Sequence, residues 1–136
     1  MTDRGSVEAF ADAVADRFGR ADVLVNNAGL AAGLAPIAEG DERDWAVMLE
    51  TNVLGLLRVT RAFLPLLRAA PHAHIVNLGS IAGGEVYPGI QPLTADDVAD
   101  CVAFVVTRPP HVDIDRLVVR PVAQAAAYMV ARADTR

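Results

Sequence analysis

Apolar side chains recur at regular intervals along the chain and predict alternating helices and strands. In residues 6–18 an apolar position returns every four residues, from Phe10 to Phe18, which indicates an amphipathic helix that ends at Gly19. Residues 23–28 then begin with a continuous apolar run, as is typical of a parallel strand covered on both faces. The chain therefore starts with a predicted helix followed by a predicted strand.

Residues 44–67 form the longest periodic segment. Its apolar side chains, with the amide of Asn52 among them, spread over a wide arc of the predicted helix. The acidic residues Asp41, Glu42 and Asp44 gather at its start, where the helix dipole favours negative charge. The arc is wider than a helix with a single buried side needs, so this helix is expected to contact more than its own sheet.

The second half of the chain repeats the alternation of strand and helix. Residues 75–78 predict a short apolar strand that leads into a glycine-rich loop at 79–89. Thr94 begins a third predicted helix, with Asp97 as its capping-box partner. The predicted inward positions of this helix are Val98, Cys101, Val102 and Val105.

The C-terminal part completes the predicted fold. Pro109 and Pro110 end the third helix, residues 116–121 predict a last strand, and residues 122–136 are an alanine-rich tail of helix-forming composition. Helices and strands that alternate in this way are the pattern of a parallel α/β layer. The predicted fold class is α/β, in a single domain over residues 1–136.

Length and charge narrow the classes of function. The chain has 136 residues, which is enough for one domain with a buried core, and its formal net charge is -5. Its twelve basic residues are all arginines, scattered along the chain rather than gathered in a stripe, and there is no lysine. An acidic chain without a basic stripe is not expected to bind nucleic acid.

Cysteine content and hydropathy predict a soluble cytoplasmic protein. Cys101 is the only cysteine, so no disulfide forms within the chain and a reducing compartment is expected. The N-terminal residues do not resemble a signal region, and no apolar run is long enough to span a bilayer. His72 and His74 lie in a predicted turn without a further ligand at suitable spacing, so no metal site is expected.

Three short motifs carry a family resemblance. NNAG at residues 26–29, NVLG at 52–55 and IVNLGS at 75–80 resemble, in order and spacing, motifs of the short-chain dehydrogenase/reductases. Residues 91–100 and 108–121 are similar to the C-terminal part of a subgroup that acts on small hydroxy acids and alcohols with NADP. The resemblance implies a partial Rossmann-like parallel sheet of about three strands with flanking helices.

The resemblance also implies roles for five residues. In a complete family member, Asn26, Ala28 and Gly29 would line the adenosine side of the NAD(P) cleft. Ser80 would polarise the substrate oxygen, and Asn52 would hold a water on the proton relay. Structural alternatives are open at the same positions: Asn26 can tie neighbouring strands together, Asn52 can be an amide satisfied by backbone, and Ser80 can be a turn residue.

Two parts of the family pattern are missing from this sequence. The glycine-rich turn that holds the cofactor phosphates in a complete member does not precede the first predicted helix. The family's catalytic tyrosine and lysine follow the serine by about thirteen and about seventeen positions, which are Leu93 and Asp97 here. The join at residues 89–90 resembles an internal loss of the tyrosine segment. No turnover is therefore expected, and binding of NADP or NAD is expected to be weak or absent.

The missing parts predict exposed apolar surfaces. In the family, the helix equivalent to residues 44–67 contacts its counterpart in another subunit, so a homo-oligomer through this helix is expected. The strand at 23–28 lacks a family neighbour, which predicts an unpaired apolar edge. Three functions are open: an inactive oxidoreductase remnant, an interaction module that associates with itself or a complete paralogue, and an enzyme whose missing segments are supplied in trans.

Overall fold

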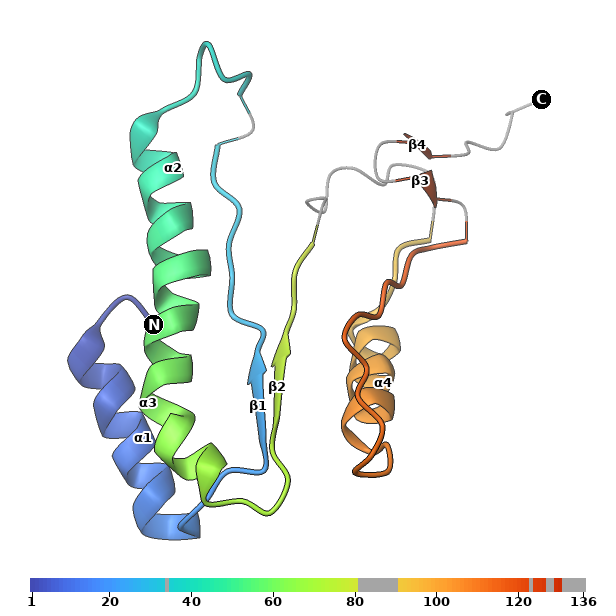
Figure 1. Ribbon diagram of the computed structural model, residues 1–136. Coiled ribbons are helices and arrows are strands. Elements are labelled where there is room, and N and C mark those ends of the chain that lie inside the picture. The colour runs from blue at the N-terminus through green and yellow to red at the C-terminus, as the bar shows by residue number, and fades with distance from the viewer. Residues whose placement is uncertain (34, 81–90, 123, 127–128, 131–136) are drawn as a thin grey trace. The chain divides into compact units, whose positions relative to one another are not determined.

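The computed structural model describes residues 1–33, 35–80, 91–122, 124–126 and 129–130 (Figure 1). The chain divides into two compact units, Met1–Gly79 and Ser80–Arg136, and each unit is described by itself. Most of the glycine-rich loop predicted at 79–89 lies outside the described residues. A single domain over the whole chain stays a prediction.

The first helix, α1, spans Arg4–Phe18 and has well-defined ends. Its N-cap is Asp3, whose carboxylate accepts the backbone N–H of Ser6 at 2.6 Å. It ends at Gly19, whose φ of 71° lies in the left-handed region that favours glycine. The sequence therefore predicted the end of this helix correctly.

The buried side of α1 differs from the stripe that the phenylalanines suggested. Val7 and Ala11 are buried, whereas Phe10 and Phe18 are 58% and 64% exposed. Val7 and Ala11 are four residues apart and so lie on one helix face, which is rotated away from the phenylalanine stripe. The two rings consequently remain on the surface of the first unit.

Two parallel strands form the sheet of the first unit. β1 (Val23–Asn26) pairs with β2 (His74–Asn77), and the register places Asn26 beside Asn77. The connection between them runs through a helix, as parallel strands require. Figure 1 shows α1 side by side with the long helix, and β1 and β2 next to its last part, α3 (Leu56–Arg68). The predicted α/β class is confirmed.

The long helix predicted at 44–67 is present but not uniform. It consists of α2 (Glu42–Met48), the π-helical segment η1 (Leu49–Gly55) and α3 (Leu56–Arg68). Asp41 caps its start by accepting the backbone N–H of Arg43 at 2.8 Å. A π-helical turn hydrogen-bonds to the fifth residue along the chain and so takes in about one more residue than an α-helical turn. The sequence predicted the location of the helix but not this interruption.

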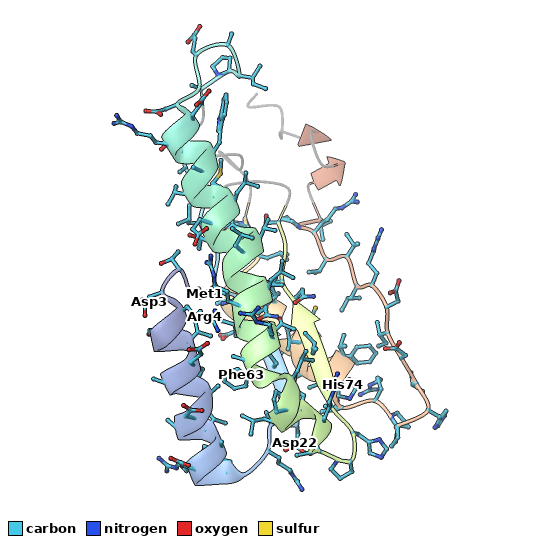
Figure 2. All side chains as sticks on the ribbon, turned by 60° about the vertical axis from the view of Figure 1, so that its left-hand side comes forward. Met1, Asp3, Arg4, Asp22, Phe63 and His74 are labelled. Atoms are coloured by element: carbon cyan, nitrogen blue, oxygen red, sulfur yellow. The ribbon has the colours of Figure 1, made fainter. Side chains whose placement is uncertain are left out.

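The core of the first unit lies where α1, α3 and β1 meet. Phe63 of α3, labelled in Figure 2, is only 4% exposed. Its ring lies 5.2 Å, centroid to centroid, from the ring of Phe10. The buried cluster consists of Ala11, Leu24, Phe63, Leu66 and Leu67. Because this cluster is small, each of its large side chains is expected to matter for stability.

The second unit contains the predicted third helix. α4 spans Ala95–Val106, and Thr94 and Asp97 form the predicted capping box at its start. None of its side chains is fully buried. The four predicted inward positions are all half-buried: Val98, Cys101, Val102 and Val105.

Two predictions for the C-terminal part were wrong. Residues 116–121 have no regular secondary structure, so the parallel sheet in the described residues has two strands instead of about three. The tail predicted to favour a helix contains two short antiparallel strands, β3 (Gln124–Ala126) and β4 (Met129–Val130). A strand needs a hydrogen-bonded neighbour, and helix propensity is weak enough for other contacts to override it.

Candidate functional site

The carboxyl end of the two-stranded sheet is tied together by Asn26. This side chain is 4% exposed, and its Nδ2 donates to Oδ1 of Asn77 at 2.8 Å and to Oγ1 of Thr60 at 3.0 Å. One amide thus joins β1, β2 and α3. Asn26 therefore ties the two strands together, which was one of the two roles predicted for it. Its role in cofactor binding stays a prediction.

The same amide leaves an acceptor without a partner. Oδ1 of Asn26 is buried and accepts no hydrogen bond from any described residue. A buried polar atom in this state costs about 1–3 kcal/mol relative to a satisfied one. Oδ1 of Asn26 can therefore accept a hydrogen bond from one further donor, such as a water.

Asn52 lies in η1 and holds the loop that follows β1. Its Oδ1 accepts the backbone N–H of Leu30 at 2.9 Å, and its Nδ2 donates to the backbone oxygen of Leu30 at 2.7 Å. A Cβ on Gly29 would lie 3.3 Å from Oδ1 of Asn52, so the close approach favours glycine there. The structure brings Gly29 and Asn52 together. Asn52 is exposed and satisfied by backbone, and its role in a proton relay stays a prediction.

Two more glycines fit the loop against α2. Gly33 has a φ of 68°, and a Cβ there would meet Oδ2 of Asp44 at 2.6 Å. At Gly40 a Cβ would meet the ring of Trp45, also at 2.6 Å. The signal for this fit in the sequence is weak, namely glycines in a loop followed by a helix start. The loop is therefore closely packed on the helix that carries Asn52.

The remaining two predicted site residues are placed differently. Ala28 is exposed, two residues beyond the end of β1. Ser80 follows β2 by three residues and is the first residue of the second unit, whereas Asn52 belongs to the first. The catalytic role of Ser80 stays a prediction. Thr60 and Asn77 were not predicted as site residues, although Asn77 ends its strand as Asn26 does.

Asp97, which lies seventeen residues after Ser80 as the family's lysine does, serves as a helix cap. Its Oδ2 accepts the backbone N–H of Thr94 at 2.7 Å and the hydroxyl of Thr94 at 2.8 Å. The backbone N–H bond, followed by the hydroxyl bond, lowers the pKa of Asp97 below its usual value of 3.8. The side chain is consequently a carboxylate at neutral pH, already engaged by its own helix.

This cap makes the helicity of α4 dependent on pH. Because the pKa of Asp97 is depressed in the folded state, its stabilising contribution is present above the usual value of 3.8 and is lost as pH falls through the lower folded value. We expect the amide signals of α4 in NMR spectra to report loss of helix at that acidic pH. Asp97→Asn should lack this transition, and Asp96→Asn, which removes the neighbouring charge, should keep it. An identical titration for all three proteins would contradict the prediction.

Within the described ranges, no group of three or more histidine, cysteine or acidic side chains is arranged to hold a metal ion. None of the helices in the described part of the chain has the length and apolar character needed to cross a bilayer. The hydrogen-bonded cluster at the sheet's carboxyl end is thus the candidate site that the structure presents.

The family is established by comparison with known proteins. The sequence model of the short chain dehydrogenases matches residues 1–96, and the chain belongs to this family. Its relatives are oxidoreductases, and at the level of the family the reaction is NAD(P)-dependent oxidoreduction.

Two curated relatives and one solved structure show how far the similarity extends. Sulfoacetaldehyde reductase 2 of Chromohalobacter salexigens is 31% identical over 193 residues, which cover 97% of this chain and 77% of the relative. Serine 3-dehydrogenase of Agrobacterium fabrum is 30% identical over an alignment that covers 93% of this chain and 74% of the relative. A serine dehydrogenase in its closed form with NADP+ is 28% identical, with a TM-score of 0.82, over 93% of this chain and 75% of that one.

The alignment with the reductase is longer than this chain. Its 193 positions exceed the 136 residues by 57, so at least 57 aligned positions have no residue of this chain opposite them. The chain therefore lacks residues that this relative has within the aligned span. This agrees with the internal loss that the family pattern predicts.

Proposed function

We propose that this chain is a catalytically inactive member of its family, the remnant of an NAD(P)-dependent oxidoreductase of small alcohols, carbonyl compounds or hydroxy acids. One observation carries the proposal: the 136 residues contain no lysine, and the positions thirteen and seventeen residues after Ser80 hold Leu93 and Asp97 instead of a tyrosine and a lysine. The capping role of Asp97 supports it, because the carboxylate is already committed to α4.

Electrostatics favour the same conclusion. In the family's reaction a tyrosine phenol exchanges a proton with the substrate, and a nearby ammonium lowers the phenol's pKa toward neutrality. A carboxylate has the opposite effect, since a negative charge disfavours ionisation of a neighbouring acid. A tyrosine introduced at Leu93 would thus be followed, four residues later, by the negative charge of Asp97 instead of the positive charge of a lysine.

The described residues also do not fit the pyrophosphate of NAD(P). A dinucleotide's phosphates bind at a helix N-terminus with free backbone N–H groups. Here the N-termini of α1, α2 and α4 are each capped by an acidic residue of the chain: Asp3, Asp41 and, with Thr94, Asp97. A carboxylate at a helix N-terminus accepts hydrogen bonds from backbone N–H groups that a phosphate would need, and its negative charge repels an anion. The strand end at Asn26–Gly29 remains, without an open phosphate site among the described helices.

The assay that tests inactivity measures nicotinamide absorbance. With the purified chain we expect no NADPH oxidation with sulfoacetaldehyde and no NADP+ reduction with serine above the rate without protein, because the acid–base pair is absent. Millimolar NADPH should also leave the thermal melt unshifted. A full-length serine 3-dehydrogenase is the positive control. Turnover proportional to the concentration of the chain would overturn the proposal.

A second candidate function is an interaction module. The long helix exposes Leu49, Val53 and Leu57, which are 60%, 47% and 57% exposed. A shallow groove on α3 is lined by Leu54, Leu57, Arg58, Thr60, Arg61 and Leu64. Exposed apolar surface of this kind marks association sites. We propose association of this helix with a second copy of the chain or with a complete paralogue.

Leu57→Glu tests association through the long helix. In a symmetric pair the substitution places two carboxylates in the apolar contact, so we expect self-association to weaken by about tenfold or more. Sedimentation velocity over a range of concentrations measures it. Glu42→Gln, on the exposed first turn of α2, is a control for a change of charge. Unchanged self-association of Leu57→Glu would remove this helix from the proposal.

A further inference from the structure

The outer edge of β1 is not paired with another strand among the described residues of the first unit, whose sheet consists of β1 and β2. On the other edge, the carbonyl oxygens of Asp22 and Asn26 accept from the backbone N–H groups of His74 and Leu78 at 2.9 Å and 3.0 Å. Because successive residues of a strand direct their backbone groups to opposite edges, Val23 and Val25 direct theirs away from β2.

An apolar groove lies between this edge and α1. Its volume is about 630 Å³, and its lining includes Phe10, Phe18, Val23 and Val25. Both phenylalanines are more than half exposed, and the two valines are 40% and 41% exposed. At the start of β1 the only charges lining the groove belong to Arg20 and Asp22, which pair with each other at 3.2 Å. The groove therefore offers an extended apolar segment both hydrogen bonds and side-chain contacts.

We propose that this edge binds the same edge of a second copy of the chain. The two β1 strands run antiparallel about a two-fold axis that places Leu24 of one copy opposite Leu24 of the other. Val23 then faces Val25 of the other copy, and each of these two pairs exchanges two backbone hydrogen bonds. The oxygen of Val25 also accepts the N–H of Asn27 at 3.1 Å, and its second lone pair takes the bond from the other copy. The result is a four-stranded sheet in the order β2, β1, β1, β2, with the free edge of β1 removed.

The side chains in this register complement one another. Each Val23 packs on a Val25 on the less covered face of the sheet, and β-branched cross-strand pairs of this kind are stabilising. Asp22 stands opposite Asn26, so a carboxylate faces an amide residue and no like charges meet. In a pairing shifted by one residue, the outward N–H and C=O groups of one copy would face residues of the other copy whose own N–H and C=O groups point to β2. Hydrogen bonding therefore disfavours a shift by one residue, and no like charges oppose the proposed register.

The aromatic side chains extend the contact. A two-fold axis perpendicular to the sheet keeps the helix-covered faces of both copies on the same side, so the groove beside α1 meets its counterpart. Phe side chains bury about 150–250 Å² each, so two half-exposed rings contribute about 200 Å² per copy toward the roughly 800 Å² of a stable partner surface. The pairing is therefore weak and concentration-dependent. It rests on the proposed interaction function and adds a surface distinct from the long helix.

Disulfide trapping tests the register in the full chain. In a Cys101→Ser background, Val23→Cys and Val25→Cys are made separately and mixed in equal amounts under mild oxidation. Hydrogen-bonded antiparallel pairs have Cα atoms about 5.5 Å apart, which suits a disulfide. The mixture should give a cross-linked heterodimer. Each variant alone should not, because its cysteines lie two residues out of register, about 7 Å along the strand.

Proline at position 25 provides an independent measurement. Val25→Pro removes an outward N–H and leaves the bonds to β2 in place, so far-UV circular dichroism should be retained. Two hydrogen bonds are lost per symmetric pair, which should weaken self-association by roughly tenfold or more. Equal cross-linking in single variants and mixture, or none in either, would overturn the edge proposal. Self-association lost in Leu57→Glu but kept in Val25→Pro would leave the helix surface standing alone.

Discussion

Replacing Phe63 by alanine is expected to abolish cooperative unfolding of the first unit. Its side chain is 4% exposed and lies in the cluster that joins α1, α3 and β1. Phe→Ala substitutions in a core cost about 3–5 kcal/mol, which is most of the stability of a small domain. A thermal melt followed by circular dichroism at 222 nm should lose its sigmoidal transition.

Phe10→Ala is the matched control for this prediction. Phe10 contacts Phe63 with a ring-to-ring distance of 5.2 Å but is 58% exposed. Its removal takes away part of one aromatic contact, so we expect a loss of about 1 kcal/mol and a transition that stays cooperative. If the two variants melted alike, the core would not be centred on Phe63.

Asn26→Ala is expected to have the second-largest effect on stability. The substitution removes the side-chain hydrogen bonds that join β1, β2 and α3 and leaves Oδ1 of Asn77 and Oγ1 of Thr60 without this donor. The expected loss in the free energy of unfolding is about 1–3 kcal/mol. Urea unfolding, with a wild-type m-value as evidence of an unchanged transition, measures it.

The adjacent amide gives the control for Asn26. Asn27 is exposed, and the backbone bond from its N–H to the oxygen of Val25, at 3.1 Å, does not depend on its side chain. Asn27→Ala should therefore change the stability by no more than about 0.5 kcal/mol. Equal losses for the two variants would mean that the strand end is stabilised by something other than the Asn26 amide.

Local signals in the sequence predicted local structure well. The end of α1 at Gly19 and the capping box of Thr94 and Asp97 were both predicted, because each depends on residues within one turn of the helix. Residues 116–121 were predicted as a strand and are not one in the structure. Their apolar composition suits a strand, but a strand forms only beside a partner that local sequence cannot identify.

The candidate site was predicted less completely than the fold. The motif resemblance singled out Asn26 and Asn52, and the structure gives each amide a network of its own. The partners of these amides were not predictable, because Thr60 and Leu30 are brought to them by helix packing and loop closure rather than by sequence spacing. The role of each side chain therefore depends on contacts across long distances in the chain.

The π-helical segment lets the long helix hold one extra residue without changing the rotational phase between its two halves. Because a π-helical turn takes in about one more residue than an α-helical turn, deleting one residue within Leu49–Gly55 would restore an unbroken helix and leave α2 in nearly the same phase relative to α3. Deleting one residue from the regular helix α3 would instead rotate the segments on its two sides by about 100° relative to one another. This short segment is consequently the part of the long helix in which a one-residue deletion would least disturb the fit of Asp44 and Trp45 against their glycines.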